Sequence, residues 1–380
     1  MGKLTLKKLI QNLILLFISC LFVVVILEVA LRIMKNDKYY VWDPHLKVTF
    51  RPLPQLFPGV IGESHYYVNS EGFRAEEIPE VVKLKIITLG GSTTECVYLD
   101  QKEAWPYLLQ KNLSEQLNNP VWVGNAGKRG MTTYEHIVQT SILLKQYPDI
   151  DLILILPGVN DLQRRFGSKN NYKPKKLNQD VYLKAFDRTP DYNPNFPFYK
   201  KTELWRSLSK LRYLFIDAKS QLDSEGEILQ KWRQNRKAAK MILNELLDLE
   251  QSLNDYEKNL LKIIDIANQH NVRLVFITQP VIWYKGMPKE LEDLCWFGGV
   301  GNYQNEKGKE YFSIEVLEKG MRLYNARLRK ICKEKNIFLV DLEDKLPKDT
   351  TVYYDDCHYN ENGSRIVAEL ISAEVEKILK

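Results

Sequence analysis

The sequence predicts an α/β protein in which a parallel sheet lies between two layers of helices. Short apolar runs that end in turn residues alternate along the chain with longer segments of helical periodicity. One run, residues 151–156, is almost continuously apolar, as in a central parallel strand that is covered on both faces. Because right-handed crossovers connect the strands of such a sheet, the alternation indicates a three-layer α/β/α fold.

The N-terminal segment is predicted to be a transmembrane anchor. No residue from Leu9 to Leu27 is charged, and at about 1.5 Å per residue this stretch forms a helix of roughly 28 Å, close to the thickness of a bilayer's hydrocarbon core. No small-residue cleavage site follows it, which favours an uncleaved anchor over a removed signal peptide. The long absence of charge disfavours a third interpretation, a buried core helix. We therefore expect a tail at residues 1–8 and an anchor at residues 9–33.

The orientation of this anchor is weakly encoded, because basic residues flank it on both sides. A short N-terminal tail before a large C-terminal domain is typical of a signal anchor. The sequence therefore predicts a single-pass membrane protein whose C-terminal domain is extracytoplasmic.

The elements of the domain follow in order. Residues 34–82 are expected to be a membrane-proximal extension, because Pro52, Pro54 and Pro58 exclude a long helix there. Residues 83–380 are expected to form the domain, with an insertion at about 162–225 that interrupts the alternation. Strands are expected at residues 84–89, 121–125, 151–156, 272–278 and 337–341, and helices at about 103–117, 134–146, 227–269, 315–335 and 361–379.

Composition restricts the possible partners. The formal charge of +6 is small for 380 residues, and basic and acidic residues are interspersed, so nucleic acid is not expected as a partner. Cys20 lies in the anchor, which leaves four cysteines for the domain. Disulfides and free buried thiols are both compatible with their spacing.

Ser92 is a candidate nucleophile. It follows Gly90 and Gly91 at the end of the first expected strand, where glycines permit a sharp turn that exposes the hydroxyl. The alternative is structural, because residues 92–95 read S-x-x-E, the pattern of a capping box that starts a helix.

His358 is the candidate base. It follows Asp355 by three residues in a loop before the last helix, so the carboxylate can hold one ring nitrogen while the other faces a serine. A loop histidine beside a helix cap is the alternative. The other histidines lie in the extension or in helical stretches without a suitable acid: His45, His65, His136 and His270.

Two residues are candidate donors to a developing oxyanion. Asn160 follows the third expected strand and carries a side-chain amide, and Gly127 follows the second and offers an unobstructed backbone N–H. Ordinary turn roles are the alternative for both. Asp161 and Asp356 are expected to bond to nearby backbone amides rather than to act as further acids.

In this chain order, the motifs resemble those of the SGNH (GDSL-like) hydrolase superfamily over roughly residues 83–380. Ser92 matches the block I serine, Gly127 the block II glycine and Asn160 the block III asparagine, while Asp355 and His358 match the block V D-x-x-H. The resemblance implies a flavodoxin-like fold with Ser92 as nucleophile, His358 as base and Asp355 as orienting acid. It also implies that the Ser92 amide, the Gly127 amide and the Asn160 side chain bind the oxyanion.

One residue departs from that pattern. Block I usually reads G-D-S, and Gly91 stands in place of the aspartate. We expect this change to leave the serine intact and to alter how the turn is braced. The anchor together with residues 69–74 also resembles membrane-anchored bacterial members of the superfamily.

The sequence thus predicts a membrane-anchored serine esterase that removes acyl groups, such as acetyl, from carbohydrate or lipid through an acyl-enzyme. An O-acyltransferase with the same triad is one alternative, since the acyl-enzyme is common to both. A non-catalytic envelope binding or assembly protein that retains the fold is another. No metal or organic cofactor is expected. Residues 164–201 are rich in basic and aromatic side chains and form either a lip for a polar or anionic substrate, such as an acylated glycan, or a solvated loop.

Overall fold

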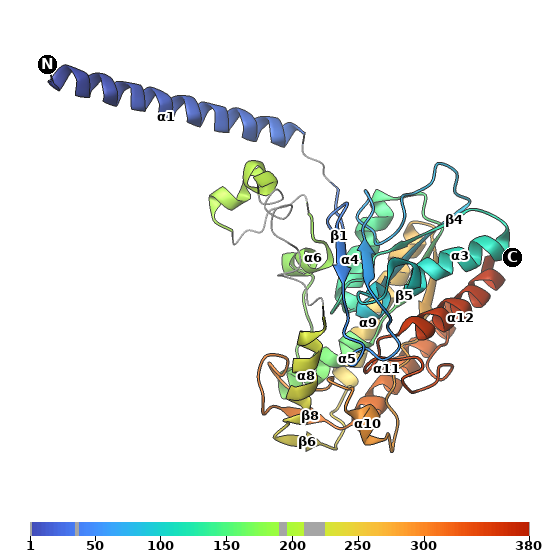
Figure 1. Ribbon diagram of the computed structural model, residues 1–380. Coiled ribbons are helices and arrows are strands. Elements are labelled where there is room, and N and C mark those ends of the chain that lie inside the picture. Colours follow the sequence, from blue (N-terminus) through green and yellow to red (C-terminus); the bar gives the residue numbers. More distant parts are fainter. Residues whose placement is uncertain (1, 35–37, 190–195, 209–224, 380) are drawn as a thin grey trace. The chain divides into compact units, whose positions relative to one another are not determined.

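A computed structural model describes residues 2–34, 38–189, 196–208 and 225–379 (Figure 1). The chain divides into two compact units. One comprises Met1–Lys38 and Thr189–Gln221, and the other comprises Tyr39–Arg188 and Leu222–Lys380. The expected insertion is therefore shared between the units, and its residues 190–195 and 209–224 lie outside the described residues.

The second unit is built on a five-stranded sheet in which every pair of neighbours is parallel. Across the sheet the order is β4 (Val121–Asn125), β3 (Leu84–Gly90), β5 (Leu152–Leu156), β7 (Arg273–Ile277) and β9 (Phe338–Val340). Every residue of β4 and β5 is buried, which accounts for their apolar sequences. This is the flavodoxin-like order, whose direction of winding reverses between β3 and β5. Ligands of such sheets bind at the carboxyl ends of the strands beside that reversal.

Two groups of helices cover the sheet. In one, α3 (Trp105–Leu117) contacts α12 (Glu361–Leu379). In the other, α9 (Glu250–Gln269) contacts both α4 (Thr133–Gln146) and α11 (Ile314–Lys335). The prediction of a three-layer α/β/α fold is confirmed.

The remaining elements are short or join the layers. In chain order they are β1 (Lys47–Phe50), β2 (Ser64–Tyr67), α2 (Ser92–Glu95), η1 (Gln101–Glu103), α5 (Val159–Ser168), η2 (Lys169–Asn171), α6 (Gln179–Ala185), η3 (Phe198–Lys201), α8 (Glu227–Lys237), β6 (Met241–Leu243), α10 (Lys289–Glu292) and β8 (Glu310–Phe312).

The prediction of one long helix at residues 227–269 is wrong, because α8 and α9 are separate helices. Between them β6 pairs in parallel with β8, which lies far along the chain. The Arg236 guanidinium near the end of α8 also donates to the carbonyl oxygens of Phe297 and Phe312. Backbone pairing with distant residues stops the helix, and local periodicity cannot reveal it.

The segment before the sheet contributes to the core of the second unit from Tyr39 onward. The Asn69 side chain accepts bonds from the amides of Glu71 and Phe73 and so forms the turn that leads to Arg74. Arg74 is buried, and its guanidinium donates to carbonyl oxygens of the loop after α2, at Glu95, Cys96 and Leu99. This segment therefore braces the turn that contains Ser92.

The first unit contains α1 (Gly2–Ile33). A window of 18 residues within Leu6–Ile33 has a mean hydropathy of 3.0, and the helix is long and apolar enough to cross a membrane. Near its end, the Glu28 carboxylate accepts bonds from the amides of Glu203 and Leu204.

The cysteines of the second unit are free and buried: Cys96, Cys295, Cys332 and Cys357. The sequence left disulfides and free buried thiols open, and the structure shows free buried thiols.

Candidate active site

Ser92 and His358 meet at the carboxyl edge of the sheet. Gly91 is the N-cap of α2 and Ser92 is the first helical residue. The Ser92 hydroxyl Oγ lies 2.7 Å from Nε2 of His358. No side-chain hydrogen bond caps α2, so the capping-box interpretation of residues 92–95 is wrong. The hydroxyl is instead directed at an imidazole from the other end of the chain.

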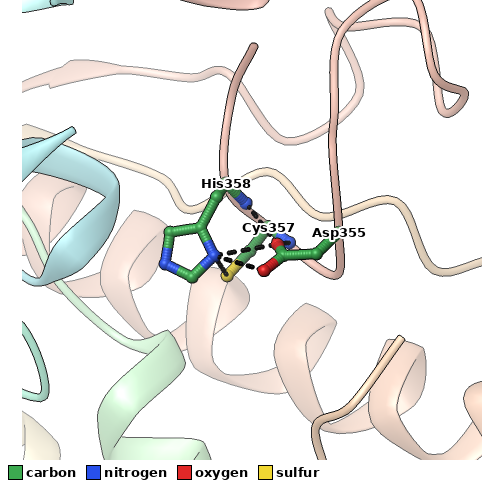
Figure 2. A group of neighbouring side chains, drawn as sticks. All are labelled: Asp355, Cys357 and His358. Carbon is green, nitrogen blue, oxygen red and sulfur yellow. Dashed lines mark hydrogen bonds and ion pairs between the residues drawn. The ribbon is translucent and has the colours of Figure 1, made fainter. Parts of the chain in front are cut away.

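Asp355 holds the other nitrogen of the same ring. Figure 2 shows its carboxylate facing His358 Nδ1, and the shorter oxygen-to-nitrogen distance is 2.7 Å. One carboxylate oxygen also accepts the backbone N–H groups of Cys357 and His358, which makes a tight turn of this loop. The loop geometry therefore fixes the acid and the base relative to each other.

An indole completes the surroundings of this carboxylate. Trp296 Nε1 donates to Asp355 Oδ2 at 2.9 Å. The adjacent Asp356 accepts bonds from the amides of Trp296 and Phe297 and from the Trp283 indole, as expected for an acid that bonds to backbone. Asp356 thus positions the Trp296 loop, and Trp296 in turn positions Asp355. Sequence reasoning missed Trp296, since nothing local links it to residues 355–358.

The charges of the two groups favour a His358 base. Burial lowers the pKa of His358, but the negative charge and the hydrogen bond of Asp355 outweigh burial and raise that pKa above its usual 6.5. Burial raises the pKa of Asp355, yet His358 and the Trp296 indole outweigh it and hold the pKa below its usual range. Asp355 therefore stays ionised and stabilises an imidazolium form of His358.

The loop after β4 is bonded to the Ser92 turn and to Asn160. Lys128 N–H donates to Gly90 O at 3.1 Å, and Arg129 N–H donates to the Glu95 carboxylate at 2.7 Å. On the other side, Asn160 Nδ2 donates to Met131 O at 2.9 Å. The ends of three adjacent strands, β4, β3 and β5, therefore form one hydrogen-bonded unit.

Of the two glycines in the loop after β4, the expected donor Gly127 lies outside the pocket around Ser92, and Gly130 lines it. Gly127 N–H donates to Asn125 Oδ1 at 2.9 Å, and Gly127 is not among the residues that line the pocket around Ser92. Gly130 does line that pocket, and among the described residues its N–H has no hydrogen-bond acceptor. Its φ of +70° favours glycine. The available signal was a second glycine in the same loop, two residues before Thr132, the N-cap of α4.

The surroundings of Gly91 explain why a glycine replaces the aspartate of the G-D-S pattern. A Cβ at this position would lie 2.3 Å from Asn160 Nδ2. The glycine therefore allows the amide of Asn160 to approach the backbone of the Ser92 turn, where an aspartate would displace it.

We expect Gly91→Ala to lower kcat about tenfold to a hundredfold, because the added Cβ displaces a side chain beside the Ser92 hydroxyl. Steady-state kinetics on a soluble ester measures the loss. The control is a double-mutant cycle with Asn160→Ala, in which the same glycine change costs little once the amide is gone. An equal loss in both backgrounds would show that Gly91 acts through something other than Asn160.

The pocket that contains Ser92 has a volume of about 700 Å³. Both His358 and Asp355 line it, as do Gly130 and Asn160. Its other residues include basic side chains from the first half of the chain and aromatic side chains from several loops: Arg129, Arg164, Lys175, Lys184, Tyr98, Trp232, Trp296, Phe297, Tyr303 and Tyr354. From the expected lip, the pocket is lined by Arg164, Gly167, Lys175 and Lys184. The aromatic lip residues Phe196, Phe198 and Tyr199 belong to the other unit.

The remaining candidates are structural. Asp161 accepts bonds from the amide and hydroxyl of Thr133, and so caps α4. His136 is fully buried, and burial lowers its pKa to about 4. Asp355, Cys357 and His358 bring potential metal-ligand atoms within 4.8 Å of one another (Figure 2). However, Nδ1 of His358 faces Asp355, and burial raises the pKa of the Cys357 thiol well above its usual value, so a protonated thiol is a poor ligand.

Comparisons with known proteins agree with this architecture. The sequence model of the GDSL-like lipase/acylhydrolase family matches residues 88–366. The chain belongs to this family, and it is accordingly an enzyme that hydrolyses ester bonds. A search of curated proteins finds no match.

Several solved structures are similar to the chain. An acetyl xylan esterase, AlAXEase, is 14% identical over 77% of this chain and 100% of its own, with a TM-score of 0.41. The acetylxylan esterase Axe2 from Geobacillus stearothermophilus is 13% identical over 77% and 94%, with a TM-score of 0.42. An alpha/beta hydrolase from the metagenome of Lake Arreo, Spain, is 13% identical over 78% and 96%, also with a TM-score of 0.42.

Proposed function

We propose that the chain is a membrane-anchored serine esterase whose catalytic residues are Ser92, His358 and Asp355. The observation that carries the proposal is the relay from Asp355 through both nitrogens of His358 to the Ser92 hydroxyl, in a pocket open to a substrate. His358 takes the proton of the Ser92 hydroxyl as the Ser92 oxygen attacks the ester carbonyl. The alcohol leaves with that proton, and a water molecule then hydrolyses the acyl-enzyme with His358 again as base.

The oxyanion of each tetrahedral intermediate binds the backbone N–H of Ser92, the backbone N–H of Gly130 and the side chain of Asn160. All three residues line the pocket. One N–H of the Asn160 amide is used by Met131 O, which orients the other.

We expect Asn160→Ala to lower kcat about a hundredfold to a thousandfold with little change in KM, because the amide acts mainly on charge that develops in the transition state. Steady-state kinetics on a soluble acetate ester measures both constants. A matched fall in affinity with unchanged kcat would assign Asn160 to ground-state binding instead.

The nucleophile is tested by covalent labelling. A fluorophosphonate probe should modify the full-length protein in detergent once per chain, and peptide mass spectrometry should locate the adduct on Ser92. Labelling of another residue, or none together with no turnover over a wide ester panel, would refute the proposal.

Helix α1 supports membrane anchoring. We propose that the second unit lies outside the cytoplasm. Acylated carbohydrate is the proposed substrate class, and the aromatic side chains of the pocket support it because they can stack on sugar rings. They support a second activity as well, O-acyl transfer to a sugar hydroxyl. Transfer is distinguished from hydrolysis by adding a saccharide acceptor and measuring whether acyl groups are diverted from water.

A further inference from the structure

The pocket around Ser92 has two chemically different walls. The basic wall consists of Arg129, Arg164, Lys175 and Lys184. The aromatic wall consists of Tyr98, Trp232, Trp296, Phe297, Tyr303 and Tyr354. Among the described residues that line the pocket, Asp355 is the only carboxylate, and its charge is committed to His358.

The carboxylates that neutralise the basic wall lie behind it. Glu95 pairs with Arg129, and Glu135 is shared by Lys175 and Lys184. The two glutamate side chains are 1% and 0% exposed, whereas the three basic side chains are 34–52% exposed. The basic side chains are therefore partly accessible to a ligand, and their partners are not.

Arg164 adds a positive charge that no ion pair among the described residues neutralises, although the buried Asp161 carboxyl lies within range of its charge. Its guanidinium lies over the rings of Tyr172, at 4.6 Å, and Tyr134, at 5.5 Å, and it donates to Lys173 O. Stacking holds the group in place without cancelling its charge. The four basic residues and the two glutamates thus leave an excess of positive charge at the pocket.

We propose that this pocket selects acyl esters whose alcohol part is an acidic saccharide, with the anionic group at Arg164 and its basic neighbours and the sugar ring against the aromatic wall. The inference rests on the proposed esterase function and specifies its substrate class. An anionic lipid is the competing ligand. The observations favour a saccharide because the apolar lining is mainly flat rings, with Val97, Ile228 and Leu229 as its aliphatic members.

The test compares two substrates that differ only at C6 of the sugar, which is a carboxylate in one and a hydroxymethyl group in the other. Acetate release from an acetylated methyl glucuronoside and from the matching acetylated methyl glucoside is measured with the full-length protein in detergent. We expect the wild type to prefer the acidic ester by about tenfold in kcat/KM. Arg164→Gln should reduce that preference about tenfold, and Arg164→Lys should reduce it less, because the charge remains without the planar stack.

The control is Lys176→Gln, which removes the same charge from an exposed neighbour that does not line the pocket. It should retain the wild-type preference. Equal rates on the two sugars, or the same preference in Arg164→Gln as in Lys176→Gln, would overturn the inference while leaving esterase activity intact. Faster cleavage of dioctanoyl phosphatidic acid than of either sugar would overturn the saccharide assignment. Absence of turnover on every ester would instead refute the proposed function.

Discussion

Ser92→Ala should lower kcat by at least about a thousandfold. The hydroxyl is 2.7 Å from His358 Nε2 and is the group that we assign to attack the carbonyl. Without it, binding and the oxyanion donors can only promote slow attack by water. Hydrolysis of a p-nitrophenyl acetate panel measures the loss, and fluorophosphonate labelling should vanish in parallel.

Ser141→Ala provides the matched control, since this exposed serine of α4 does not line the pocket. Its kinetics and labelling should equal those of the wild type. The thermal unfolding midpoint of Ser92→Ala should stay near the wild-type value, because only one half-exposed hydroxyl is removed. If Ser92→Ala retained more than a tenth of the activity in a folded protein, another nucleophile would have to be sought.

Asp355→Asn should lower kcat about a thousandfold to ten-thousandfold, as expected when the acid that orients a catalytic imidazole becomes an amide. The amide cannot stabilise the imidazolium, and it can donate to Nδ1 and so favour the wrong tautomer. A matched control is Asp344→Asn, which makes the same change at an exposed ion pair with Arg322 and should leave kcat unchanged.

The pH profile of the same variant has a defined sign. His358 must be neutral to act as a base, so kcat/KM should rise with pH through the pKa of this residue. In the wild type that pKa is raised by Asp355 against the lowering effect of burial, so activity should be lost at acidic pH with a midpoint above 6.5. In Asp355→Asn burial remains and the largest raising charge is gone, with only the smaller effects of Asp356 and Glu95 left, so the midpoint should move to lower pH. An unmoved midpoint would contradict the assignment of His358 and Asp355 as a pair.

Local sequence patterns were sufficient to predict the five strands of the parallel sheet. Each expected strand overlaps an observed one, since apolar runs such as residues 152–156 report burial on both faces. The helix boundary at residues 238–249 was not predictable, because β6 ends the helix by pairing with β8 across a long separation in the chain. Only backbone partners that are distant in sequence decide that boundary.

In the candidate site, too, local contacts could be predicted from the sequence and contacts between distant residues could not. The pairing of Asp355 with His358 is a property of one turn and could be predicted from spacing. The choice between Gly127 and Gly130 could not, because it depends on which amide is already bonded to Asn125. Trp296 also escaped sequence reasoning, since its indole reaches Asp355 from a separate loop.

Trp296 links the shape of the pocket to the pairing of Asp355 with His358. Its indole N–H donates to the Asp355 carboxylate, which raises the pKa of His358. Its ring lines the pocket and packs against Trp232, with 4.4 Å between ring centroids. A substitution that replaces the Trp296 indole to fit a new substrate therefore also removes a hydrogen bond from Asp355. At this residue, substrate range and optimum pH have to evolve together.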